Sequence, residues 1–357
     1  WDRDLPTAPN LVEVERDGQV IPAVAQATKS GHLFLFHRET GEPLFPLEEV
    51  PVTGAGVPGE FPAASQPLPL TPPPFANQVF ELTDINAASR EYVAALIRDM
   101  VVNRPFHAPD ENGLVIYPGL DGGANWGGQA WDADGRLLYV NTNEVPWHFT
   151  MVPHAGAMED VISLEFSYLQ FCGGCHGPDR TGSGDLFPSI RHVRDKYWPW
   201  EIWDIMRNGR GRMPGLREVP WYYLLGPLVY LYTAGDDAPT TRAERPDDVA
   251  GYIADGFHEL LDEYNLPGSK PPWGSLVAID PGAGEIRWKV SLGDYPQALA
   301  MGLSGLGAVN YGGPVVTAGG LVFIAATPDN RIRAFDKDTG DVLWEATLPA
   351  AGFATPA

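Results

Sequence analysis

Short apolar runs separated by turn residues make up most of the chain outside residues 157–235. Five of these runs are rich in β-branched, aromatic and leucine residues, as strands are. They lie at 33–36, 137–142, 275–279, 321–326 and 331–335. Gly 40 and Pro 35 are scattered rather than periodic, which suits a chain with many turns. The pattern predicts a mainly β protein.

One nine-residue phrase recurs at 37–45, 280–288 and 336–344, each time directly after one of these runs. A glycine is always fifth and an aromatic residue ninth, giving the pairs Gly41 and Phe45, Gly284 and Trp288, and Gly340 and Trp344. The phrase predicts a strand, a tight glycine turn and a second strand, with the aromatic locking one unit onto the next. That is the build of a β-propeller blade. Unrelated hairpins are the alternative, and the matched spacing favours repetition.

Residues 157–235 lose this alternation and gain helical periodicity. Apolar positions spaced for helices occupy 161–171, 200–206 and 222–232. We therefore expect a small helical domain inserted into a β chain. The expected division is a first propeller segment at 1–156, the helical domain at 157–235, a polar linker at 236–270 and a second propeller segment at 271–357.

The net charge of −22 gives the chain an acidic surface that repels phosphate backbones. Nucleic acid is therefore excluded as a partner, whereas a basic redox partner would suit it. No run reaches the roughly 18 apolar residues of a membrane span, and no secretory leader is present. The chain opens on Trp1 within what reads as a folded pattern, so we expect a partial or processed sequence.

The motif Cys172-Gly-Gly-Cys175-His176 has the form of a c-type haem attachment site. Two thiols reach the two vinyl groups of one porphyrin, and the adjacent histidine ligates the iron. The alternatives are a disulfide, half of a zinc site or a redox dithiol. Zinc would need two further ligands and the chain has only these 2 Cys, while a dithiol leaves His176 unexplained. We predict covalent haem c.

The sixth iron ligand is expected downstream of a helix, and Met213 in Gly211-Arg-Met-Pro-Gly215 fits best. The proline after it favours an extended loop that can present sulfur. Met206 is the rival, but it lies on an apolar helical face. A Met/His pair raises the haem potential and suits an electron carrier. The whole segment resembles a class I cytochrome c, which implies a periplasmic or otherwise extracytoplasmic location.

The β segments resemble the dehydrogenases that depend on pyrroloquinoline quinone (PQQ), most closely their glucose dehydrogenase branch. Several strings carry the resemblance in family order: Trp1-Asp-Arg-Asp-Leu-Pro6, Ala25-Gln-Ala-Thr-Lys29-Ser-Gly31, Gly122-Gly-Ala-Asn125-Trp126-Gly-Gly128, Lys270-Pro-Pro-Trp-Gly274, Asn310-Tyr-Gly-Gly-Pro314 and Phe353-Ala-Thr-Pro356. The family fold is an eight-bladed propeller, and the signatures here account for about half of it. The resemblance thus implies a partial eight-bladed β-propeller with an inserted all-α cytochrome c domain.

The resemblance also implies site residues. Asp2 would be the catalytic base, close to a Ca²⁺ or Mg²⁺ ion beneath PQQ and a ligand of it, and Lys29 would hydrogen-bond the quinone oxygens. Without the resemblance, an aspartate near a strand end is more often a turn cap, and a lone lysine is usually a surface group.

Four further residues are implied as PQQ contacts. Asn125 would contact the edge of the cofactor plane, with Trp126 beside it. Asn330 and Arg331 would face the ring from the last blade.

Together these features imply an enzyme that oxidises a sugar or alcohol hydroxyl by hydride transfer to PQQ. Electrons would then pass singly to its own haem and on to an external cytochrome or quinone. One alternative is a non-enzymatic electron-transfer protein whose propeller is only a scaffold. Another is a two-haem nitrite reductase type of propeller, which would need histidine ligands for a second haem.

Overall fold

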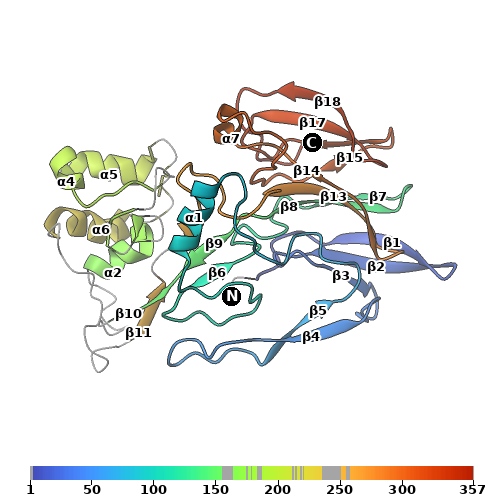
Figure 1. Ribbon diagram of the computed structural model, residues 1–357, viewed down its shortest axis with the longest axis horizontal. Coiled ribbons are helices and arrows are strands. Elements are labelled where there is room, and N and C mark those ends of the chain that lie inside the picture. Colours follow the sequence, from blue (N-terminus) through green and yellow to red (C-terminus); the bar gives the residue numbers. More distant parts are fainter. Residues whose placement is uncertain are drawn as a thin grey trace.

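Antiparallel β-sheets form most of the structure, and a cluster of helices lies at one end of it (Figure 1). The computed structural model describes residues 3–154, 164–173, 176–177, 179–182, 187–210, 213, 215–217, 219, 221–234, 251–254 and 258–356. The expectation of a mainly β chain is confirmed. The larger strands are β1 (Asn10–Arg16), β2 (Gln19–Ala27), β3 (Leu33–His37), β7 (Gln129–Asp132), β8 (Leu137–Asn143), β13 (Gly274–Asp280), β14 (Glu285–Ser291), β16 (Leu321–Ile324), β17 (Arg331–Asp336) and β18 (Val342–Thr347).

The shorter elements join and flank these strands. The strands among them are β4 (Leu47–Pro51), β5 (Ser65–Pro69), β6 (Leu114–Ile116), β9 (Trp147–Phe149), β10 (Met151–His154), β11 (Gly251–Ala254), β12 (His258–Glu259) and β15 (Val315–Val316). The helices are α1 (Ala87–Leu96), α2 (Leu164–Tyr168), α4 (Val193–Lys196), α5 (Pro199–Asn208), α6 (Trp221–Thr233), α7 (Pro296–Ala300) and the π-helical turn η1 (Leu169–Gly173).

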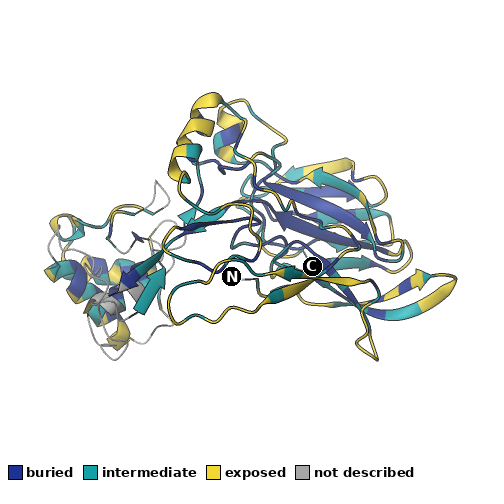
Figure 2. Cartoon of the chain, turned by 60° about the horizontal axis from the view of Figure 1, so that its bottom comes forward, coloured by how far each residue is buried: buried dark blue, intermediate teal, exposed yellow. Residues whose placement is uncertain are grey.

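Three sheets have the form of propeller blades. Their strand orders are β1-β2-β3, β14-β13-β8-β7 and β15-β16-β17-β18, and every pairing in them is antiparallel. The five predicted runs all form strands within these sheets. The core lies where the sheets face one another, because β8 is buried along its whole length and β13 nearly so (Figure 2).

The repeated phrase forms the same turn in each blade. The glycine N–H donates to the carbonyl of the first residue at 2.9 Å for Gly41, 2.8 Å for Gly284 and 2.9 Å for Gly340. All three glycines have positive φ angles, between +72° and +77°, where side chains are strained. The predicted strand–turn–strand unit is confirmed.

In two of the three copies the ninth residue, Phe45 or Trp288, packs onto the neighbouring sheet, as predicted. A methyl group on Gly284 would lie 3.0 Å from the Phe45 ring, and one on Gly340 would lie 2.8 Å from the Trp288 ring. Trp288 also donates its indole N–H to the Lys337 carbonyl at 3.0 Å. Gly284 and Gly340 therefore each pack against an aromatic ring from the preceding sheet, whereas nothing lies within 4 Å of a methyl group placed on Gly41.

The helical insert interrupts a single blade. Strand β8 pairs with β13 although residues 144–273 separate them in the chain. The two ends of this excursion run side by side, since β9 pairs with β12 and β10 with β11 (Figure 1). Residues 251–254 and 258–270, expected as the end of a polar linker, are therefore a folded part of the β structure. Leu260 and Leu266 within them are fully buried.

The helices pack around their own apolar core, formed by residues of α2, η1, α5 and α6. The three helical stretches expected from the sequence correspond to α2 with η1, α5 and α6. Helix α6 crosses α2 at Gly226, where a side chain would collide with Ser167. None of the described helices combines the length and apolar character needed to cross a membrane.

The β4–β5 hairpin and helix α1 are among the features that were not predicted. Helix α1 does carry a start signal, because the Asn86 side chain accepts the Ser89 N–H at 2.8 Å as an N-cap. Its apolar positions are too few to reveal a helix by periodicity.

The aromatic lock makes a stability prediction. Trp288→Ala removes the ring that packs against Gly340 and its indole hydrogen bond. We therefore expect the free energy of unfolding to fall by about 3 kcal/mol. Trp344 holds the same position in the next phrase but is 50% exposed, so Trp344→Ala should cost about 1 kcal/mol or less. Urea unfolding of the full-length variants measures both. Equal losses would contradict the lock.

Candidate functional site

Lys29 lies in the turn after β2, with its amino group paired to a carboxylate. Its Nζ is 2.8 Å from Asp4 Oδ1, and the side chain is only 11% exposed. Asp4 is 57% exposed, so the pair opens toward solvent on the aspartate side. Asp2, the predicted base, lies outside the described residues.

A glycine-rich loop runs directly against Lys29. The Gly123 N–H donates to the Lys29 carbonyl at 2.6 Å, and the Ala124 N–H donates to the Thr28 carbonyl at 3.1 Å. Gly122 has a φ of +76°, and any side chain there would collide with the aliphatic stem of Lys29. The close approach therefore requires glycine at this position.

The same loop carries Asn125 and Trp126, directly after the backbone bond from Ala124 to Thr28. The Asn125 side chain is fixed at both ends, because its Nδ2 donates to the Asp121 carbonyl at 2.9 Å and its Oδ1 accepts the Trp126 N–H at 2.7 Å. Trp126 is 55% exposed. Three of the predicted PQQ residues thus lie together, and their roles remain predictions.

Three residues of this site were not foreseen: Asp121, Trp147 and Tyr311. Trp147 Nε1 donates to Asp121 Oδ2 at 3.0 Å, and the Tyr311 hydroxyl donates to Asp121 Oδ1 at 3.1 Å. Burial raises the pKa of Asp121, while these two donors and the Lys29 charge act in the opposite direction. Burial and the neighbouring Asp121 raise the pKa of Tyr311. Tyr311 lies in the string at 310–314, but no motif marks Asp121 or Trp147, and the three come from distant segments of the chain.

Asn330 and Arg331 lie at the start of β17. Asn330 adopts a φ of +59° in the preceding turn. Arg331 forms an ion pair with Glu345 of β18 at 2.5 Å, and both side chains are more than 40% exposed. Across the described residues, no hydrogen bond or ion pair joins either of them to Lys29. Their contact with PQQ remains a prediction.

His176 in the helical cluster is oriented by a backbone carbonyl. Its Nδ1 lies 2.9 Å from the Pro188 oxygen, and since a carbonyl only accepts, Nδ1 carries the proton. Burial lowers the pKa of His176, which favours the neutral ring. Nε2 is then the basic nitrogen, as in a histidine that binds a metal.

The residues around His176 form a buried setting. Cys172, on η1, is 6% exposed and belongs to the helical core. Tyr168 donates its hydroxyl to the Gly177 carbonyl at 2.7 Å and stacks on Tyr230 at 5.0 Å. This fixes the chain just after His176. Cys175 lies outside the described residues.

The two candidate methionine ligands have different settings. Met213 is half-buried in a tight loop, with reciprocal backbone hydrogen bonds of 3.1 Å to Arg210. Met206 is 2% exposed within the core face of α5. Because Met206 packs in the core of the helices, Met213 remains the predicted sixth ligand of the iron.

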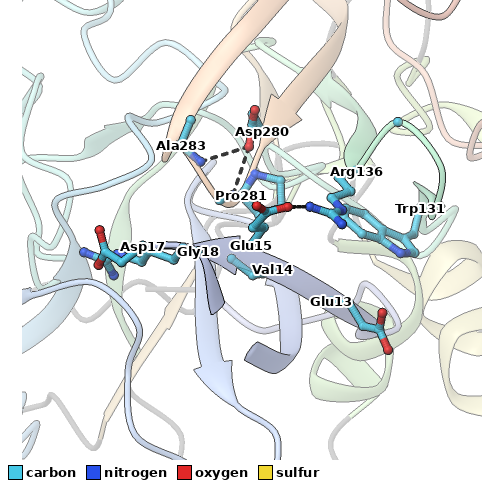
Figure 3. A pocket seen from close by; sticks show the side chains of 13 residues that line it. Glu13, Val14, Glu15, Asp17, Gly18, Trp131, Arg136, Asp280, Pro281 and Ala283 are labelled. Carbon is cyan, nitrogen blue, oxygen red and sulfur yellow. Dashed lines mark hydrogen bonds and ion pairs between the residues drawn. The ribbon is translucent and has the colours of Figure 1, made fainter. Parts of the chain in front are cut away.

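A hollow of about 580 Å³ lies away from both groups, between the β1–β2 hairpin and the turns after β7 and β13 (Figure 3). An ion pair between Glu15 and Arg136 crosses it. None of its lining residues belongs to the Lys29 or His176 groups. Within the described part of the chain, no three His, Cys, Asp or Glu side chains gather as a metal site.

The chain leads from the Lys29 group into the segment that holds His176. Trp147, which touches Asp121, begins β9, and β10 follows after a single residue. Strand β10 and its partner β11 then lead toward the helical cluster (Figure 1).

Comparison with known proteins places the β part in a family. Residues 1–165 and 232–357 match the family described as "PQQ: Glucose/ethanol/alcohol dehydrogenase, beta-propeller domain". The match passes over residues 166–231, which hold nearly all of the helical cluster.

Curated relatives align with the whole chain. The quinate/shikimate dehydrogenase (quinone) of Acinetobacter baylyi is 28% identical, and the quinoprotein glucose dehydrogenase of Escherichia coli is 24% identical. Each alignment covers 100% of this chain but only 36% and 37% of the relative. The quinohemoprotein alcohol dehydrogenase structure from Comamonas testosteroni has a TM-score of 0.47 at 17% identity, covering 100% of this chain and 33% of that one. On the family match, which takes in most of its length, this chain belongs to the β-propeller family of PQQ-dependent dehydrogenases.

Proposed function

We propose that the full-length protein is a PQQ-dependent dehydrogenase that oxidises a sugar or alcohol hydroxyl and carries its own electron relay. In this proposal, residues 157–235 form a cytochrome c domain inserted into one blade of an eight-bladed propeller. The family match on both sides of residues 166–231 supports an insertion, and so does the separate core of the helices.

The Lys29 group fits an anionic quinone cofactor. It offers an almost buried ammonium, a rigid amide at Asn125 and an exposed indole at Trp126. PQQ, when bound, supplies a quinone carbonyl that accepts a hydride and stores two electrons. The Lys29 amino group would donate to the quinone oxygen, and Asp2 would accept the substrate hydroxyl proton. Asn330 and Arg331 would complete the ring contacts.

A Ca²⁺ or Mg²⁺ ion beside Asp2 is part of this proposal. Asp2 lies outside the described residues, and the described ones gather no ligand set for a metal. We therefore derive no step through the ion.

The His176 group fits a covalent haem. The carbonyl of Pro188 holds His176 in the tautomer that leaves Nε2 for iron, and Cys172 lies in the same buried core. Thioethers from Cys172 and Cys175 would anchor the haem, and Met213 would complete the iron ligands. Haem, when bound, supplies a one-electron carrier. Since c-type haems are usually attached outside the cytoplasm, we place the protein in the periplasm or another extracytoplasmic compartment.

The observation that carries the proposal is the continuity between the two groups. Trp147 touches Asp121 beside Lys29, and the strand that it begins continues through β10 toward the helices that hold His176. Electrons released at the propeller could thus reach the haem within one molecule, and then an external cytochrome or quinone. The named relatives suggest glucose, glycerol and quinate as first substrates to test.

The relay can be tested on the full-length protein, produced with cytochrome c maturation factors and supplied with PQQ and Ca²⁺. We expect a tested sugar or alcohol to reduce the haem, seen in its α-band, only when PQQ is present. Lys29→Met should slow this reduction roughly 100-fold or more, because one donor to the developing oxyanion is lost. Dithionite should still reduce the haem of this variant. A haem that dithionite reduces but no substrate reduces would leave the electron-transfer protein as the function.

The iron ligand can be tested with two methionines. Met213→Ala should abolish the weak near-infrared absorption of methionine-ligated ferric haem and lower the reduction potential. Met206→Leu, a volume-conserving change in the core, should leave both properties intact. If Met206→Leu moves the potential and Met213→Ala does not, the assignment is reversed.

A further inference from the structure

Asp121 contacts more of the Lys29 group than any residue that the sequence singled out. Its two carboxylate oxygens accept hydrogen bonds from Trp147 and Tyr311, and its backbone carbonyl accepts the Asn125 side-chain amide. These partners come from β9, from the segment after α7 and from its own loop. The Asp121 side chain therefore orients the Trp147 indole and the Tyr311 phenol, and the Asp121 backbone carbonyl orients the Asn125 amide.

The ionisable groups around Asp121 come from several segments of the chain. Lys29 between β2 and β3, Tyr295 at the start of α7 and Tyr311 after α7 interact with Asp121 directly. Around these lie Asp4, which pairs with Lys29, and Glu259 on β12, which acts on both tyrosines. Arg3, which donates to the Pro118 carbonyl, acts on His32. Burial lowers the pKa of His32 to about 4, so this ring is neutral near pH 7. The Lys29 ammonium already faces the Asp4 carboxylate at 2.8 Å. An ionised Asp121 is thus a second negative charge beside one lysine.

PQQ carries three carboxyl groups and is an anion at neutral pH. Bringing it to Lys29 while Asp121 is ionised would place like charges together in a partly buried site, which disfavours the ionised form of Asp121. The hydrogen-bond network can accept a proton if the Tyr311 hydroxyl, which now donates to Oδ1, rotates to become the acceptor. Trp147 can only donate, so it keeps Oδ2 as an acceptor, whereas the Tyr311 hydroxyl can accept as well as donate. A proton on Oδ1 would then point at the Tyr311 oxygen.

We propose that Asp121 is a positioning residue of the PQQ site that takes up a proton when the cofactor binds. This inference rests on the proposed function. It makes cofactor affinity depend on pH through a residue outside the family strings that identified Lys29 and Asn125. The sign follows from linkage. Proton uptake means that affinity rises as the pH falls. Between the pKa of Asp121 in the free protein and its higher pKa in the complex, affinity weakens by up to tenfold per pH unit as the pH rises.

Asp121→Asn removes the negative charge of the side chain but keeps its shape. The amide keeps an oxygen for Trp147 and places an N–H toward Tyr311, so it imitates the protonated acid. We expect this variant to lose the pH dependence that is due to Asp121 and to bind PQQ more tightly than the wild type at alkaline pH. A residue that only supported the fold would weaken binding at every pH. Asp17→Asn removes the same charge from an exposed position lining the distant hollow, and it should keep the wild-type slope.

The experiment titrates the full-length protein with PQQ at several pH values, by calorimetry in two buffers of different ionisation enthalpy. Wild-type protein should take up as much as one proton per PQQ, and Asp121→Asn should take up correspondingly less. PQQ binding by the wild type without proton uptake, or with the same uptake in Asp121→Asn, would overturn the inference alone. No PQQ binding by the wild type would overturn the proposed function itself. The wild-type proton count decides the question even if the variant fails to fold.

Discussion

Both the β structure and its candidate site depend on the hydrogen bonds that Asn310 forms with the end of β8. Asn310 is fully buried and binds the end of β8 through its side chain and its backbone. Its side-chain oxygen accepts from Asn141 at 2.6 Å and its side-chain nitrogen donates to the Thr142 carbonyl at 3.0 Å. Its backbone N–H donates to the Asn143 side chain at 2.7 Å, and its carbonyl accepts from that side chain at 2.9 Å. Buried polar networks of this kind specify one arrangement, since any slip leaves several groups unsatisfied. The next residue, Tyr311, is thereby held against Asp121. The string at 310–314, which supported the family resemblance, therefore holds the end of β8 and positions Tyr311 beside Asp121.

The repeat made the β fold readable from sequence. Each copy encodes a local turn, and a glycine with positive φ opposite an aromatic ring is a requirement that few other residues meet. Hence the strands, turns and inter-sheet lock could be predicted. The pairing of β8 with β13 could not be predicted, because residues 144–273 separate the two strands in the chain. The strands at 251–259 were also hidden, since each is too short to show a period.

The candidate site divides in the same way. Lys29 and Asn125 could be named because they sit in strings that resemble a family, and the described structure brings them together through Gly122. Asp121, Trp147 and Tyr311 were missed because their meaning arises only from contacts across 26 and 190 positions of chain. His176 was readable from its motif, whereas its orientation by the Pro188 carbonyl, twelve residues away, was not. The sequence alone reveals residues that belong to a short motif. The partners that folding brings to them from distant parts of the chain become visible only in the structure.

The position of the insert follows from the same physics. An insertion is tolerated best where its two ends already lie together, since closing it then costs little further entropy. Strands β9 and β10 leave the blade beside β12 and β11, which return, so the ends are paired before the helices begin. The aromatic contacts that join neighbouring sheets lie outside this excursion and are undisturbed. Because the outgoing strand starts at Trp147, the insertion point that is least costly for folding also begins at the candidate cofactor site. The relay that we propose would therefore need no new scaffold to bring its two centres into one molecule.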